Sequence, residues 1–138
     1  MHVSTERFLP GEELKTSLQQ YVATQGLEAA FIITCVGSVS KATLRFSTQQ
    51  SGPGSEKVVT YDENLEICSL VGTLSHDGSH LHAVLGRADG SVVAGHVVGD
   101  MVVQTTAEVV IGDSTTEKYS RVLDPATSYN ELVITKRQ

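Results

Sequence analysis

The sequence has few basic residues. Its 138 residues include 10 lysines and arginines against 16 aspartates and glutamates, and the formal net charge is −6. The longest basic run is Lys136-Arg137. Domains that bind duplex nucleic acid usually carry a basic stripe that neutralises phosphates. The composition therefore counts against direct nucleic-acid binding, although a local basic patch would be compatible with it.

Long apolar runs are also missing. No stretch reaches the roughly 20 apolar residues that a transmembrane helix needs. The first residues, MHVSTERFLPGEEL, lack the basic and apolar regions of a signal peptide. We therefore expect a cytoplasmic protein without a membrane partner.

Cysteine is scarce as well, with only Cys35 and Cys68. Both lie in apolar runs that are typical of strands. In an intracellular protein a reduced, buried thiol is commoner there than a disulfide. We expect both thiols to be buried and inert.

The length fits one domain, because a chain of this size buries about two-thirds of its unfolded surface. We expect a single domain over residues 1–138, with its core at about 7–134. A helix is predicted from Glu12 to Gln25, with two glutamates at its positive end and Gly26 placed to terminate it. Its apolar positions form one stripe: Leu14, Leu18, Tyr21 and Val22.

After this helix the pattern changes to the alternation of strands. The predicted strands are 31–36, 42–46, 57–61, 65–74, 80–88, 92–98, 101–111 and 131–136. Short turns separate them, which favours antiparallel neighbours. Asp124-Pro125 predicts a short helical turn, and 51–56 an exposed loop. We expect an α+β fold, a single twisted, largely antiparallel sheet with one main helix packed on it.

Three of the five histidines fall in one predicted hairpin, at His80, His82 and His96. Side chains two residues apart in a strand point to the same face, so His80 and His82 share a face. Whether His96 joins them depends on the turn around Asp89-Gly90. A two-residue turn would place His96 opposite Ala83, on the wrong face.

A three-residue loop, Ala88-Asp89-Gly90, pairs Arg87 with Ser91 instead and sets His82 directly opposite His96. Asp-Gly suits both turns, and we adopt this register. Cross-strand partners have Cβ atoms roughly 4.5 to 5.5 Å apart. Three imidazoles gathered so closely match a site that holds Zn²⁺ and leaves one coordination position open. The alternative is that the histidines hydrogen-bond only to one another or to water.

Several separated blocks resemble a known family in the expected order. They are AAFIITCVGSVSKATLRF, LEICSLVGTLSHDGSHLHAVLGRADGSVVAGHVVGD and TTAEVVI, preceded by the predicted helix. The chain resembles the PPC domain, found in plants and prokaryotes and attached in plants to AT-hook DNA-binding segments. The resemblance covers about residues 7–132. The fold is also similar to one half of acetolactate decarboxylase, which holds zinc by a comparable set of histidines.

The resemblance implies a homotrimer and a metal, zinc, held at the positions of His80, His82 and His96. Long β-branched runs, which one helix cannot cover, agree with a trimer. Two departures are visible. The family's Gly-Gly-His-Leu stands here as Ala94-Gly95-His96-Val97, and the Arg-Gly-Arg-Pro core of the AT-hook is absent. The DNA function of the plant proteins therefore does not transfer with the domain.

Residues around the histidines suggest a ligand pocket at Gly72, Asp77 and Ser79. Asp77 and Ser79 flank the trio and can orient an imidazole, although turn chemistry alone also explains Asp77. If a three-residue loop, 76–78, precedes the histidine strand, Gly72 lies opposite His82 and leaves space for a small ligand. The alternative is that Gly72 marks a bulge or bend.

Catalysis also needs a proton donor or acceptor within reach of the site. The charged residues inside apolar strands are Arg45, Glu66 and Glu108. Glu66 lies about 20 Å along its strand from the site. Glu108 is likewise too far along its own strand to reach the site. The position of Arg45 relative to the site does not follow from the sequence. We expect these charges to form ion pairs between subunits. The sequence offers no evident general acid or base.

Three functions follow from these observations. The first is a homotrimeric zinc-binding domain that holds a small anionic or carbonyl-bearing ligand, or a partner. The second is a zinc-dependent lyase or hydrolase acting on a small oxo or hydroxy acid, which rests on analogy of fold. The third is a DNA-associated oligomerisation module without an AT-hook.

Overall fold

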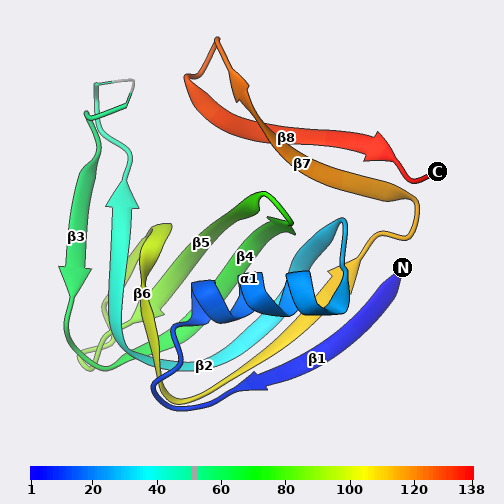
Figure 1. Cartoon of the computed structure of the whole chain (residues 1–138). Coiled ribbons are helices and arrows are strands. Elements are labelled where there is room, and N and C mark those ends of the chain that lie inside the picture. Colours follow the sequence, from blue (N-terminus) through cyan, green and yellow to red (C-terminus); the bar gives the residue numbers. More distant parts are fainter. Residues whose placement is uncertain (51–52) are drawn as a thin grey trace.

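The computed structural model describes residues 1–50 and 53–138. Within them lie one helix and eight strands (Figure 1). The elements in chain order are β1 (His2–Phe8), α1 (Leu14–Gln25), β2 (Ala30–Phe46), β3 (Lys57–Tyr61), β4 (Leu65–Ser75), β5 (Gly78–Gly86), β6 (Val92–Asp113), β7 (Glu117–Asp124) and β8 (Tyr129–Lys136). The predicted α+β fold, a mostly antiparallel sheet with one helix, is confirmed.

The helix is the predicted one, and its ends follow from local chemistry. The Glu13 side chain accepts a hydrogen bond from the Thr16 N–H, which caps the amino end. Gly26 adopts the left-handed conformation with φ 64°, and its N–H bonds back to the last turn. Leu14, Leu18 and Val22 are buried against the sheet. Figure 1 shows α1 lying across one face of it.

Six strands form the main sheet in the order β1-β6-β5-β4-β2-β3, and β6 also pairs with β2. The antiparallel pairings therefore run from β2 through β4, β5 and β6 and back to β2. This ring curls the sheet and gives it two faces. The inner face, under α1, carries the apolar core, whose largest fully buried side chains include Leu44, Leu65, Leu74, Leu81 and Leu85. We call the opposite surface the outer face.

Two predicted strand breaks are wrong. Residues 31–36 and 42–46 form the single strand β2, and residues 92–98 and 101–111 form the single strand β6. At Gly37 the ladder with β6 shifts its register, and a Cβ there would lie 2.0 Å from the Thr106 carbonyl oxygen. The glycine permits a bulge and a close approach of two backbones, not a turn. Asp100, with φ 53°, lies at a corresponding irregularity in β6.

A separate two-stranded sheet, β7 paired with β8, was not predicted in full. The predicted strand 131–136 is the larger part of β8, whereas residues 117–124 were not assigned to a strand. The turn between the two begins at Asp124, whose carbonyl accepts the N–H groups of Thr127 and Ser128. This agrees with the helical turn predicted at Asp124-Pro125. Figure 1 shows the hairpin standing beyond the ends of the main strands.

Other predictions concern the loop at 51–56 and the cysteines. Residues 51 and 52 lie outside the described residues, while Pro53 and Gly54 form an exposed turn. Cys35 is buried as predicted, but Cys68 is exposed. Cys68 shares the outward parity of Glu66 along β4, so its side chain faces away from the core.

Candidate metal centre and its pocket

His80 and His82 lie on β5, and His96 lies on β6. The three-residue loop predicted between the strands is present, because the Arg87 N–H bonds to the Ser91 carbonyl at 2.8 Å and Gly90 has φ 83°. His82 is therefore paired directly with His96. The register inferred from the turn is confirmed, and all three imidazoles lie on the outer face.

The three rings form a compact cluster. Their ligand atoms all lie within 4.8 Å of one another, and the two Nε2 atoms of His80 and His82 are 3.1 Å apart. In a tetrahedral zinc site with bonds of about 2.0 to 2.1 Å, ligand nitrogens are about 3.3 Å apart. The donor type and the spacing therefore fit a metal ion. The Nδ1 atom of His96 is buried without a hydrogen-bond partner among the described residues, which leaves it free to act as a ligand.

The surroundings favour the neutral form of two of the imidazoles, those of His80 and His96. Burial, helped by the positive charge of Arg45, lowers the pKa of His96 to about 4. The pKa of His80 is also lowered, first by burial and then by His82 and Arg121. Metals bind the neutral form of histidine. His80 and His96 are thus in the form that binds metals at neutral pH.

Gly72 does not lie where the sequence placed it. The turn before β5 contains only His76 and Asp77, since Ser75 pairs with Gly78. With one residue fewer in the turn, Val71 lies opposite His82, and Gly72 pairs with Leu81. A Cβ at Gly72, whose φ is 148°, would lie 1.9 Å from the His80 carbonyl oxygen. Gly72 allows two strands to approach closely and opens no space beside the trio.

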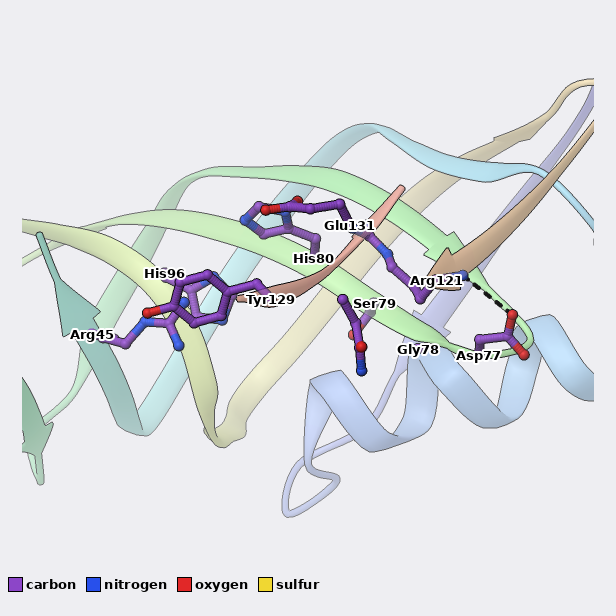
Figure 2. A pocket seen from close by; sticks show the side chains of 10 residues that line it. Arg45, Asp77, Gly78, Ser79, His80, His96, Arg121, Tyr129 and Glu131 are labelled. Carbon is purple, nitrogen blue, oxygen red and sulfur yellow. Dashed lines mark hydrogen bonds between the residues drawn. The ribbon is translucent and has the colours of Figure 1, made fainter. Parts of the chain in front are cut away.

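A cavity of about 340 Å³ lies beside the histidines, and His80, His96, Asp77 and Ser79 are among the residues that line it. The placement of Asp77 and Ser79 at a pocket agrees with the expectation. The Asp77 carboxylate accepts the backbone N–H of Arg121 at 3.3 Å, which connects the β4–β5 turn to β7 (Figure 2). The role of Asp77 is therefore to help dock the β7–β8 hairpin.

Arg45 also lines this cavity, which the sequence could not show. It is paired with His96 across β2 and β6. Its guanidinium lies over the Tyr129 ring, 5.6 Å from the centroid, and the Tyr129 hydroxyl donates to the Glu56 carboxylate. This hydrogen bond lowers the pKa of Glu56 and raises that of Tyr129. In Figure 2 Arg45, Tyr129 and His96 gather at one end of the pocket.

The β7–β8 hairpin supplies the part of the pocket that sequence reasoning missed. Arg121 from β7 and Tyr129 and Glu131 from β8 line it together with His80 and His96. Glu131 is a carboxyl group in the pocket, so the expectation that no acid or base lies near the site is wrong. The negative charge of Glu131 raises the pKa of His80 and so opposes the lowering caused by burial. The hairpin gives a weak sequence signal because neither of its faces is fully buried.

The other two charged residues lie elsewhere. Glu66 is paired with Gly86 and Ser38, and Glu108 with Arg7 and Val36. Both are exposed, and neither lines the cavity beside the histidines. Their role in contacts between subunits stays a prediction. For Arg45, the position in the pocket offers a role within one chain.

The Plants and Prokaryotes Conserved (PCC) domain, the family named PPC above, matches residues 1–115. The chain belongs to this family. The match ends before β7, so the hairpin that lines the cavity beside the histidines lies outside the matched residues.

The relatives that this chain matches are longer proteins, and the match covers only part of each. The chain is 42% identical over 130 residues to a bifunctional protein GlmU of Synechococcus, covering 94% of this chain but only 20% of that protein. It is 29% identical over 115 residues to an AT-hook motif nuclear-localized protein of Arabidopsis thaliana, of which it covers 28%. This chain therefore spans a fifth to under a third of these relatives.

Solved structures share the fold over nearly the whole chain. A hypothetical protein from Salmonella enterica is 33% identical, with a TM-score of 0.90 over 99% of this chain and 95% of its own. A metal-containing protein from Archaeoglobus fulgidus is 25% identical, with a TM-score of 0.82 over 96% and 94%. Acetolactate decarboxylase from Bacillus subtilis shares the fold alone, at 16% identity and a TM-score of 0.59, over 81% of this chain and 52% of that enzyme.

The membrane expectation has one structural test. In residues 1–50 and 53–138 no helix is long and apolar enough to cross a bilayer.

Proposed function

We propose that this PPC domain binds one zinc ion per chain at His80, His82 and His96 and uses the site to hold a small ligand. The observation that carries the proposal is the approach of three imidazole ligand atoms within 4.8 Å of one another. The related protein from Archaeoglobus fulgidus contains a metal, which supports metal binding by this chain. Three histidines that leave one coordination position open are an arrangement typical of catalytic zinc sites.

Each residue of the site has a distinct task in this proposal. The antiparallel pairing of β5 with β6 holds the three imidazoles on one face of the sheet. The Nδ1 atom of His96 is buried. A zinc ion bound by three histidines keeps an open position and can polarise a carbonyl or lower the pKa of a bound water. Arg45 adds positive charge beside His96. The site is thereby suited to an electron-rich ligand.

The test is the metal content of untagged protein, measured by elemental mass spectrometry. We expect about one zinc per chain after incubation with zinc, and none in a variant carrying His80→Ala, His82→Ala and His96→Ala. His76→Ala is the matched control, because His76 is exposed in the β4–β5 turn outside the cluster. Absence of metal from the wild type would contradict the proposal.

We also infer a homotrimer. Large apolar side chains remain exposed on strands of the main sheet, among them Ile33, Val36 and Val71. Apolar surface of this kind is typical of subunit contacts. Light scattering should give a mass of three times the 14.8 kDa of one chain. A species of 14.8 kDa at low micromolar concentration would contradict the trimer.

A second candidate function is a zinc-dependent lyase or hydrolase acting on a small oxo or hydroxy acid. Glu131 favours it, since this carboxylate lines the cavity with two of the histidines and can accept or donate a proton there. Turnover of small 2-oxo and 2-hydroxy acids by the zinc-loaded protein can be followed by NMR. Glu131→Gln should abolish any turnover while zinc stays bound. If the wild type turns over none of these acids, the binding function stands without the enzymatic one.

A further inference from the structure

In the part of the chain that the structure describes, two arginines of the pocket form no direct ion pair with a carboxylate, although Arg45 acts electrostatically on Glu56. Among the described residues, Arg87 pairs with Glu63, and Arg137 pairs with Asp113 and Glu28. Arg45 and Arg121 have no carboxylate within 4.0 Å among those residues, although both are partly buried. A partly buried guanidinium normally gains stability from an anion. Both charges are therefore available to a ligand.

The contacts of these arginines orient them without neutralising them. The Arg121 Nη2 donates to the Thr73 hydroxyl at 2.8 Å, and Thr73 is paired with His80. The Arg45 guanidinium lies over the face of Tyr129. A guanidinium has five N–H donors, so most of the donors of Arg121 are left for other acceptors. The pocket thus has one oriented cation from the main sheet and one from the hairpin (Figure 2).

The remaining lining selects among anions. Asp77 and Glu131 also line the cavity, so a doubly charged phosphate would meet two negative groups. A single carboxylate carries less charge and matches the planar fork of a guanidinium. The volume of about 340 Å³ suits a molecule of a few carbon atoms.

We propose that the pocket binds a small carboxylic acid as its anion, with Arg45 and Arg121 as the charge partners of the carboxylate. The inference rests on the proposed metal site, because the histidines form the adjoining wall of the same cavity. It adds the chemical class of the ligand and the residues that select it. Arg121 comes from β7, beyond the region matched by the family, so the hairpin has a part in choosing the ligand.

The experiment measures binding of defined probes to the full chain, with and without zinc, by titration calorimetry. Lactate and acetate are the carboxylate probes, and inorganic phosphate and chloride are the comparison anions. We expect carboxylates to bind more tightly than either comparison anion. Arg45→Gln and Arg121→Gln should each weaken carboxylate binding by about tenfold to a hundredfold, because each removes a charge-assisted hydrogen bond.

Two further variants separate ligand binding from docking of the hairpin. Thr73→Val removes the hydrogen bond to Arg121 but keeps the guanidinium, so it should retain most of the affinity. Arg121→Lys keeps the charge and should recover part of what Arg121→Gln loses. Arg87→Gln, at an exposed ion pair outside the pocket, should leave binding unchanged. In NMR spectra, lactate should shift the side-chain Nε–Hε signals of Arg45 and Arg121 and leave that of Arg87 in place.

Several results would overturn the inference. One is carboxylate binding no tighter than that of chloride by protein that holds zinc. Another is an equal loss in Thr73→Val and Arg121→Gln, which would make Arg121 a docking residue only. Tighter binding of phosphate through the same arginines would show that the pocket selects phosphate and not a carboxylate. By contrast, a protein that binds no zinc but still binds carboxylates through both arginines would support the anion site and contradict only the metal site.

Discussion

The side chains of three consecutive residues of β5 alternate between the two faces of the main sheet. Leu81 points to the inner face and is 1% exposed, whereas His80 and His82 on either side of it point outward. The inner face is mostly apolar and covered by α1, while the outer face carries the histidines, beside a cavity that the β7–β8 hairpin also lines. The difference separates two tasks within one strand. The inner face supplies stability, and the outer face carries the proposed binding site.

The largest effect on stability is expected on the inner face. Leu81→Ala should lower the free energy of unfolding by about 2 to 5 kcal/mol, because it removes a fully buried side chain and leaves a cavity. Urea unfolding of the zinc-free protein measures this change. A loss below about 1 kcal/mol would show that the core relaxes around the cavity, and the contrast between the faces would weaken.

The matched change on the outer face is His82→Ala. We expect the affinity for zinc to fall by more than about a hundredfold, since even groups that only orient a ligand contribute 10- to 100-fold. The unfolding free energy of the zinc-free protein should change by less than about 0.5 kcal/mol, because His82 is exposed. Zinc titration with a competing chelator gives the affinity. A large loss of stability without zinc would contradict the separation of tasks.

A smaller effect is expected where the hairpin is attached. Arg137 donates to the Asp113 carboxylate at 2.6 Å and to the Glu117 carbonyl at 2.8 Å. Arg137→Gln should cost about 1.5 to 3 kcal/mol within the hairpin and speed hydrogen exchange of its amides. The zinc content should not change, because the histidines are positioned by the main sheet. Parallel loss of zinc would show that the hairpin also supports the histidines.

The smallest expected effect is a difference in reactivity between the thiols of Cys35 and Cys68, which can be measured without a mutation. Burial raises the pKa of Cys35 to about 11, so at pH 8 roughly one folded molecule in a thousand carries its thiolate. A thiol reagent at pH 8 should modify Cys68 at once and Cys35 only after unfolding. Mass spectrometry of the digested protein identifies the labelled cysteine. Above pH 9 the unfolded chain releases the Cys35 proton before the folded chain does, so stability should fall as the pH rises.

The sequence sufficed to predict the parts of the site that depend on local geometry. The facing of His82 and His96 followed from the loop at Asp89-Gly90, since a short turn fixes the register of its two strands. The helix followed from its apolar stripe and from Gly26. In both cases the information lies within a few residues of the feature.

The parts that depend on distant contacts could not be predicted. Gly72 was misplaced because a turn one residue shorter moves the partner strand by one position. Arg45 reaches the pocket only because the curled sheet pairs β2 with β6. Within the described residues, Glu131 lies on a hairpin that does not pair with the strands of the main sheet, so no strand register predicts where the hairpin docks.

The pairing of β1 with the far end of β6 also bears on how the chain folds. His2 is paired with Asp113, and Phe8 with Ala107, so these contacts close loops of about a hundred residues. Domains dominated by such distant pairings fold on the millisecond to second scale, far more slowly than helical bundles. During synthesis, all three histidines leave the ribosome before the partner residues of β1 do. The three histidines of the proposed metal centre are therefore available to an ion before the sheet that carries them is complete.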